Sequence, residues 1–214
     1  MELQEQLKIY ENLLLFWNQK INLTAIKGPE EIKIKHFEDS LSILKHIDIP
    51  IGESIIDIGT GAGFPGMVLK LARPDLNVTL LDGHKKRFIF LEDLQKQLDV
   101  YCTNVHGRAE EAVKKMREQF FIATARAVAP LNILSEYCLP YVKLGGYFIA
   151  MKAEIKEELE DSKNAIKLLG GEIESVKTFR LSDQSFRTLI FIKKISQTPP
   201  KYPRISAKIL KQPL

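Results

Sequence analysis

Apolar residues recur at helical spacing over the first fifty residues of the chain. A second amphipathic run covers roughly 29–46, and the polar segment NLTAIKGP between the two runs is typical of a turn. The chain is therefore expected to begin with helices. The stripe that predicts the first of them consists of Leu3, Leu7, Tyr10, Leu13, Leu14 and Trp17.

From Ser54 onward, short apolar runs alternate with helical segments. This repetition predicts a mainly parallel sheet covered by helices on both faces. Two further runs, 172–181 and 185–194, flank the turn residues SDQ and predict an antiparallel pair at the sheet edge. The expected fold is α/β and Rossmann-like with a seven-stranded sheet. The other predicted strands are SIIDIG, NVTLLD, VYCTNV, FFIATAR and GGYFIAMK, with helices near 65–72, 84–98, 108–117, 130–142 and 154–169.

The chain is expected to divide into an N-terminal helical extension (1–50), the α/β domain (51–195) and a basic C-terminal tail (196–214). The last 22 residues carry six Lys and Arg and no acid, whereas the preceding 192 carry 25 basic and 27 acidic side chains. The prolines and lysine of TPPKYPR predict that this tail leaves the domain. Such a tail suits phosphate backbones, and a solubilising, partly disordered terminus is the alternative.

The two cysteines, Cys102 and Cys138, lie far apart and lack metal-ligand spacing, so neither a disulfide framework nor a metal site is indicated. The N-terminus has acidic residues and no apolar stretch long enough for a signal peptide or a membrane span. We expect a soluble, cytoplasmic protein.

The clearest chemical signal is the segment DIGTGAGFPG, residues 57–66, at the end of the first predicted strand. Gly61, Gly63 and Gly66 satisfy GxGxxG, a weak indication of a dinucleotide site. Asp57, two residues before the first of the alternating glycines Gly59, Gly61 and Gly63, instead matches the more specific D/ExGxGxG signature of S-adenosylmethionine enzymes. The alternative is a glycine turn that only packs helix on strand, with Asp57 as a helix cap.

Asp82 and Asp57 differ in how well they distinguish between the two candidate cofactors. Asp82 ends the second predicted strand, where Rossmann-like sheets use an acid to accept hydrogen bonds from ribose hydroxyls, and it suits either cofactor. Asp57 favours S-adenosylmethionine, because a carboxylate can hold the cationic methionine end directly or through water, whereas a pyrophosphate is anionic.

Two later motifs extend the predicted crevice. GRAEE, residues 107–111, follows the third strand, where an acid can accept a hydrogen bond from the exocyclic amine of adenine. Arg126 ends the fourth strand, at the edge where open α/β sheets bind ligands. It could support the cofactor or a substrate phosphate, or form a salt bridge to a neighbouring acid.

The sequence lacks the groups that two kinds of base methylation need. No (D/N)PP(Y/F) clamp for an exocyclic amine follows the fourth strand, and both cysteines are interpreted as buried packing residues rather than as nucleophiles for a ring carbon. Guanine N7 has an in-plane lone pair and needs no general base, only alignment with the methyl group. The sequence is consistent with that acceptor.

With these residues in hand, the chain resembles the RsmG (GidB) family, guanine-N7 methyltransferases of 16S ribosomal RNA with a class I methyltransferase fold. The resemblance implies cofactor contact by Gly59, Phe64, Ala109, Glu110 and Arg126, with Asp82 facing the ribose. It also implies a guanine pocket lined by Asn22, His36, Asp39 and Lys152. The motifs that carry it are NLTAI, HFEDSL, DIGTGAGFPG, LLDGHKKRFIFL, GRAEE, ARAVAPL and KYPR, in the family's order over nearly the whole chain.

Structural roles stay open as alternatives for some of these residues. His36 could be a surface or interface histidine, Asp39 a helical cap, and Lys85-Lys86-Arg87 a solvated face or a contact to RNA phosphate. The chain also departs from the family, with Ala153 after the lysine of the fifth strand and with Ala207 and Ile209 in the tail.

The expected partner is 16S rRNA or the small ribosomal subunit, bound by a monomer, with S-adenosyl-L-methionine as cofactor. The alternatives are a methyltransferase for another RNA, a small molecule or a protein, a nicotinamide-dependent oxidoreductase, and a non-catalytic RNA-binding module.

Overall fold

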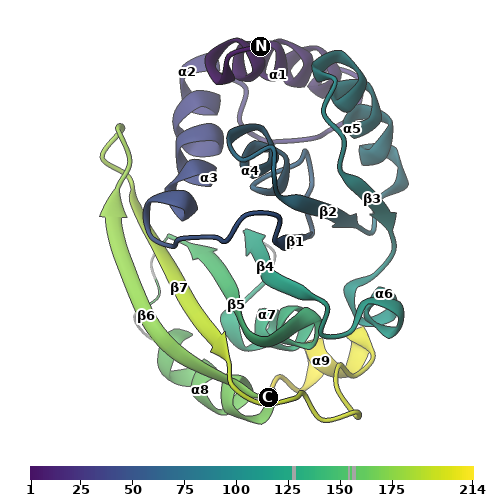
Figure 1. The fold of residues 1–214 in the computed structure, drawn as a ribbon, viewed down its shortest axis with the longest axis vertical. Helices are drawn as coiled ribbons and strands as arrows, with labels where there is room; N and C mark the ends of the chain where they lie inside the picture. The colour runs from purple at the N-terminus through teal and green to yellow at the C-terminus, as the bar shows by residue number, and fades with distance from the viewer. Residues whose placement is uncertain (127–128, 154, 156–157) are drawn as a thin grey trace.

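The computed structural model describes residues 1–126, 129–153, 155 and 158–214, and Figure 1 shows their arrangement. Seven strands form one sheet in the order β3-β2-β1-β4-β5-β7-β6. The first five pair in parallel and β7 runs antiparallel to both β5 and β6, which confirms the predicted sheet and its edge pair. The strands are β1 (Ser54–Ile58), β2 (Asn77–Asp82), β3 (Thr103–His106), β4 (Phe120–Arg126), β5 (Val142–Lys152), β6 (Gly171–Arg180) and β7 (Phe186–Lys194).

Helices cover both faces of the sheet. One face carries α1 (Leu3–Asn18), α4 (Gly66–Ala72), α5 (Lys85–Leu98) and a helical segment made of α2 (Pro29–Ile32), the π-helix η1 (Lys33–Glu38), α3 (Asp39–Leu41) and the 3₁₀ turn η2 (Ser42–Lys45). The other carries α6 (Ala109–Met116), α7 (Leu131–Cys138), the 3₁₀ turn η3 (Leu139–Tyr141), α8 (Glu158–Leu168) and α9 (Ser206–Lys211).

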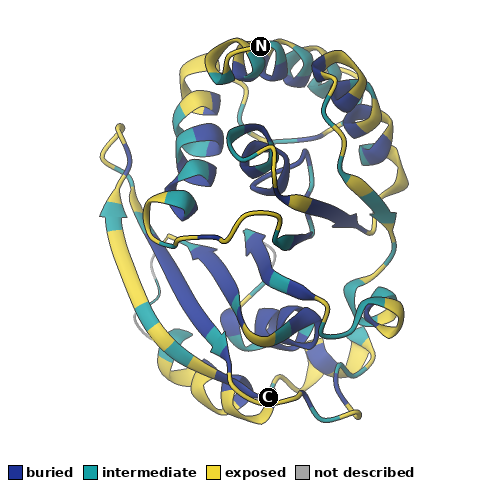
Figure 2. Ribbon diagram, viewed as in Figure 1, coloured by how far each residue is buried: buried dark blue, intermediate teal, exposed yellow. Residues whose placement is uncertain are grey.

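Alternate strand residues feed two hydrophobic cores, as the two-residue period of a strand requires. Ile55 packs among the side chains of α1, α4 and α5, whereas Ile56 packs under α7. In β7, Leu189 and Ile190 divide in the same way. Figure 2 shows the central strands buried and β6 largely exposed at the edge. The N-terminal helices therefore complete one core with the sheet.

Three predicted boundaries move by three residues or more, and one of them is the start of the strand predicted from Gly145, which begins at Val142. The strand predicted from Val100 begins at Thr103, because the Cys102 amide donates to the side chain of Gln95 in α5 (2.7 Å) instead of to β2. The helix predicted over 130–142 ends at Cys138, and Pro140 within η3 breaks it before β5 begins at Val142. The start of the helix predicted over 154–169 lies partly outside the described residues, and α8 begins at Glu158.

The prediction that the C-terminal tail leaves the domain is wrong. The Arg204 guanidinium donates to both oxygens of the buried Glu136 carboxylate on α7, with a closest N–O distance of 2.6 Å. Arg117 donates to the carbonyls of Thr198 and Tyr202, and Ile209 of α9 is fully buried. The basic segment folds back because the buried Glu136 pairs with Arg204 and because burial of apolar side chains such as Ile209 stabilises the docked state.

No helix in the described part of the chain is long and apolar enough to span a membrane.

Candidate active site

Three neighbouring cavities form a crevice at the carboxyl ends of the parallel strands. The central cavity, about 370 Å³, is lined by the glycine loop, Asp82 and His36. The α6 cavity, about 120 Å³, shares Gly59 and Asp82 with it. The β5 cavity, about 350 Å³, shares His36 and Arg126 with the central cavity. The crevice opens where β1 separates β2 from β4, the switch point at which open α/β sheets bind ligands.

The glycines of the loop after β1 have different structural roles. Gly59 (φ 72°), Gly61 (φ 60°) and Gly63 (φ 91°) all have left-handed backbones that favour glycine. A Cβ on Gly61 would meet nothing closer than 3.9 Å, and Gly59 and Gly61 line the central cavity. A Cβ on Gly63 would lie 2.5 Å from the Tyr10 hydroxyl, so Gly63 serves packing. The amides of Gly59 and Gly61 are bonded to the Leu81 carbonyl (2.8 Å) and to Asp82 (2.9 Å), so these glycines offer a ligand space at the cavity wall rather than free amides.

Asp57 lies behind this loop and lines none of the three cavities. Its Oδ2 accepts hydrogen bonds from the Thr60 hydroxyl (2.6 Å) and from the amide of Gly66, the first residue of α4 (2.8 Å). Its Oδ1 is buried and finds no hydrogen-bond partner among the described residues. Burial raises the pKa of Asp57 to about 6. The geometry matches the helix-cap alternative and gives no direct path to a methionine ammonium.

Asp82 lies between the central and α6 cavities, where the sequence predicts a ribose acceptor. It accepts hydrogen bonds from the Gly61 amide (2.9 Å), the His84 amide (2.8 Å) and Arg87 (2.6 Å). Burial would raise the pKa of Asp82, but these hydrogen bonds hold it below the ordinary value. Arg87, interpreted from sequence as part of a solvated or RNA-facing run, is instead the ion-pair partner of this acid.

Arg126 joins the sheet to the N-terminal helices. From the end of β4 its guanidinium donates to the Lys35 carbonyl (2.9 Å), to Asp39 Oδ2 (3.1 Å) and to His36 Nδ1 (2.9 Å). The π-helix η1 presents two of these acceptors, Lys35 and His36, to the same guanidinium. Arg126 lines both the central and the β5 cavities, so the salt-bridge alternative and a place in the crevice both hold.

His36 is a neutral, fully engaged side chain. Because Arg126 can only donate, His36 Nδ1 is an acceptor, and Nε2 carries the proton that it donates to Thr24 Oγ1 (2.9 Å). Burial and the charge of Arg126 lower the pKa of His36 to about 3. The ring stacks on Phe64 at 4.3 Å between centroids, so His36 is not a surface histidine.

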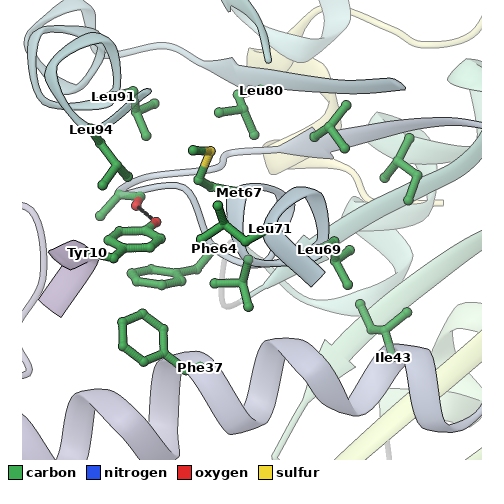
Figure 3. Close-up of a cluster of buried hydrophobic side chains, with 14 of the residues drawn as sticks. Tyr10, Phe37, Ile43, Phe64, Met67, Leu69, Leu71, Leu80, Leu91 and Leu94 are labelled. Carbon is green, nitrogen blue, oxygen red and sulfur yellow. Dashed lines mark hydrogen bonds between the residues drawn. The ribbon is translucent and has the colours of Figure 1, made fainter. Parts of the chain in front are cut away.

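Phe64 is the centre of an aromatic stack beneath the crevice. It lies parallel to the Tyr10 ring at 5.1 Å on one side and to His36 on the other, and Figure 3 shows Tyr10, Phe64 and Phe37 packed together. The Tyr10 hydroxyl donates to the Ala62 carbonyl. α1 therefore helps to position the glycine loop, a contribution that the helical pattern of α1 did not reveal.

The β5 cavity is lined by three of the four residues that the resemblance implies for the guanine pocket, His36, Asp39 and Lys152. Asp39 is buried against Arg126 and Arg187, and burial raises the pKa of Asp39 although both arginines act to lower it. Lys152 donates to Glu158 (2.5 Å) and to the Ala129 carbonyl (2.6 Å). Asn22 is exposed and lines none of the three cavities.

Near Asn22, the structure brings Thr24 into the site instead. The Asn18 side chain accepts from the amides of Leu23 and Thr24 and donates to the Thr24 carbonyl, which holds the turn against the central cavity. Arg108 and Arg187 also line the crevice. In the sequence, only their positions point to the crevice: Arg108 follows β3, and Arg187 lies within β7.

The α6 cavity contains the GRAEE motif. Ala109 and Glu110 at the start of α6 line it, as predicted, and the Tyr141 hydroxyl holds the Ala109 carbonyl (2.6 Å). Two residues that the sequence did not single out, Tyr137 of α7 and Ser206 of α9, line it as well.

Neither cysteine lines the crevice. Cys138 is fully buried, and Cys102 Sγ lies 3.7 Å from Met67 Sδ. Burial raises the pKa of Cys102 to about 12 and that of Cys138 well above its ordinary value, so both remain thiols.

Comparisons with known proteins show the fold and the family of this chain. A curated relative from Thermoanaerobacter sp. (strain X514), "Ribosomal RNA small subunit methyltransferase G", is 53% identical over 98% of this chain and 90% of its own length. TrmN from Thermus thermophilus shares the fold, with a TM-score of 0.59 at 13% identity over 73% of this chain and 48% of that one.

A second structural neighbour is described as the T. thermophilus 16S rRNA N2 G1207 methyltransferase (RsmC) in complex with AdoMet and guanosine. It has a TM-score of 0.52 at 17% identity over 74% of this chain and 39% of that one. The family model described as "GidB: rRNA small subunit methyltransferase G" matches residues 3–187. The chain therefore belongs to the GidB family of rRNA small subunit methyltransferases.

Proposed function

We propose that this protein transfers the methyl group of S-adenosyl-L-methionine to N7 of a guanine in 16S rRNA, acting in the cytoplasm as a monomer on the small ribosomal subunit. The observation that carries the proposal is that the central and β5 cavities adjoin, with His36 and Arg126 lining both. One cavity suits the cofactor and the other suits the base.

The central and α6 cavities fit S-adenosylmethionine. Gly59 and Gly61 line the central cavity without a side chain that would fill it, and Asp82 lies between the two cavities, where a ribose would meet it. Glu110 supplies an acceptor for the adenine amine in the α6 cavity. Bound there, the cofactor supplies an electrophilic methyl carbon on a positively charged sulfur. The proposed cofactor-binding residues are Gly59, Gly61, Phe64, Asp82, Ala109, Glu110 and Arg126, with Asp57 and Gly63 holding the loop.

The same loop fits a dinucleotide poorly. A pyrophosphate needs free amides at the start of the first helix. The Gly66 amide is instead bonded to Asp57 (2.8 Å), and the amides of Gly63 and Phe64 are bonded to the Thr60 carbonyl. This arrangement favours S-adenosylmethionine over a nicotinamide cofactor.

The β5 cavity suits an acceptor that needs no general base. His36 is neutral with both ring nitrogens engaged, and Asp39 is paired with two arginines. Lys152 is held by Glu158. Guanine N7 attacks through its own lone pair, so these residues need only orient the base in line with the methyl group. We propose that His36, Asp39 and Lys152 do so, while the exposed position of Asn22 assigns it an outer contact at most.

The mouth of the β5 cavity is cationic, as an RNA substrate requires. Among the described residues that line it, four are cations and one is an acid: Lys35, Arg126, Lys152, Arg187 and Asp39. Two of the cations also pair with acids beyond the lining, Lys152 with Glu158 and Lys35 with Glu31. Phosphates around the target nucleotide can exchange their counterions for these cations.

The proposal is tested with labelled S-adenosylmethionine and small subunits from cells that lack this protein. We expect incorporation of label into rRNA, stabilisation of the protein by S-adenosylhomocysteine in thermal melts, and no stabilisation by NAD. Stabilisation by NAD alone would overturn the cofactor assignment. Stabilisation by S-adenosylhomocysteine without labelling of naked rRNA or subunits would overturn the substrate assignment.

A further inference from the structure

The C-terminal segment, residues 202–211, is attached to the body of the protein next to the α6 cavity. α9 packs on α7 and lies beside α6 (Figure 1). Two consecutive residues of α7 make the attachment. Glu136, buried to 0% exposure, accepts hydrogen bonds from the Arg204 amide (2.8 Å) and guanidinium, and the Tyr137 hydroxyl lies 2.9 Å from Ser206 Oγ.

The two residues that carry these hydroxyls line the α6 cavity. Tyr137 and Ser206 share its wall with Gly107, Ala109 and Glu110. Ile209, one turn after Ser206 in α9, is fully buried and keeps the short helix seated. Ser206 of the C-terminal segment is therefore part of the cavity wall.

The two hydroxyls leave one proton free for a ligand. Each hydroxyl has one proton, and one of the two is used in the hydrogen bond that joins them. The other can be donated into the cavity, where Glu110 offers an acceptor. A donor and an acceptor side by side match the edge of adenine, on which a ring nitrogen accepts next to an amine that donates. The keto edge of hypoxanthine has the opposite polarity.

We infer that Ser206, held in place by the C-terminal segment, forms part of the cofactor site, with Tyr137 and Ser206 as specificity-determining contacts to the adenine ring and Arg204 and Glu136 as positioning residues. This inference rests on the proposed function. It makes cofactor binding and docking of the C-terminal segment mutually stabilising, because two events that share a site must affect each other equally.

The test is the affinity for S-adenosylhomocysteine, measured by calorimetry. Ser206→Ala and Tyr137→Phe should each raise Kd about 3- to 10-fold, the effect of one hydrogen bond. Arg204→Ala should raise it about tenfold or more, and Arg204→Lys should restore part of the loss. Leu210→Ala, at an exposed site on the same helix, is the matched control and should leave Kd within about twofold.

Two further readouts separate a cofactor contact from a general loss of structure. The affinity for 5′-methylthioadenosine, which lacks the amino-acid end, should fall by the same factor in each variant as that for S-adenosylhomocysteine. In the wild type, S-adenosylhomocysteine should slow amide hydrogen exchange in 205–211.

The outcomes distinguish the inference from the proposed function. If the wild type binds S-adenosylhomocysteine but Ser206→Ala and Tyr137→Phe keep its affinity, the inference is overturned and the proposed function stands. If the wild type does not bind S-adenosylhomocysteine at all, the proposed function is overturned.

Discussion

Replacing Asp57 with asparagine removes a buried carboxylate and keeps an oxygen that can accept the hydrogen bonds from Thr60 and Gly66. The wild-type carboxylate is 0% exposed, and its Oδ1 lacks a partner among the described residues. Burial, only partly offset by the bonds from Thr60 and Gly66 and by Arg126, raises its pKa from 3.8 to about 6. The ionised form is thus disfavoured in the folded protein.

The sign of the pH effect follows from proton binding. Between pH 3.8 and about 6 the folded protein keeps a proton on Asp57 that the unfolded chain has lost. Wild-type stability from this group therefore falls as the pH rises through that window and stays low above it. The raised pKa costs about 3 kcal/mol at pH 7 and about half of that at pH 5.

Asp57→Asn should become more stable relative to the wild type as the pH rises from 5 to 7, by about 1.5 kcal/mol. In a chain of this size that difference shifts Tm by about 3–6 °C. Thermal melts of both proteins followed by circular dichroism measure it, and other titrating groups cancel in the difference. The packing of the amide can change the stability of the variant by the same amount at both pH values without affecting this test. A stability difference between variant and wild type that is equal at pH 5 and pH 7 would refute the reasoning.

The remaining predictions concern three cavity and loop residues. Gly63→Ala should lower the free energy of unfolding by about 2–4 kcal/mol in urea titrations, because of its positive φ and the clash with Tyr10; an unchanged midpoint would contradict this. His36→Ala should lower kcat/KM about 10- to 100-fold, because the ring orients the base. The pH profile of the wild-type kcat should show no inflection near pH 6.5, and such an inflection would indicate that His36 acts as a base. Lys152→Met should raise KM for rRNA about 3- to 10-fold with Kd for S-adenosylhomocysteine unchanged, since Lys152 lines only the β5 cavity; a weaker cofactor affinity would argue against this division.

Chain order alone predicts which residues meet at the crevice. Apolar runs locate the strands, and parallel strands end at one edge of a sheet, so the residues after β1, β2 and β4 had to come together. Gly59, Asp82 and Arg126 accordingly lie around the central cavity. The family resemblance added His36, which no local pattern connects with the strand ends, and it gave a role to Lys152, which ends the fifth predicted strand.

Other features depend on contacts that a local pattern does not contain. The direction of the Asp57 carboxylate follows from an amide nine residues later, at Gly66. The docking of Arg204 depends on the buried Glu136, 68 residues earlier in the chain. The basic charge of the C-terminal segment predicted a free tail, although its residues Tyr202 and Ile209 indicated packing. Thr24 rather than Asn22 faces the cavity because Asn18 fixes the turn between them.

The central claim is tested most directly by identifying the methylated nucleoside. Small subunits from cells lacking this protein are incubated with it and with labelled S-adenosylmethionine, and their rRNA is digested and analysed by chromatography and mass spectrometry. The proposed chemistry predicts label in 7-methylguanosine and its absence with Gly61→Val, which closes the cofactor cavity. Label in an exocyclic-amine or ring-carbon product such as N2-methylguanosine or 5-methylcytidine would contradict a site that works without a base or a nucleophile.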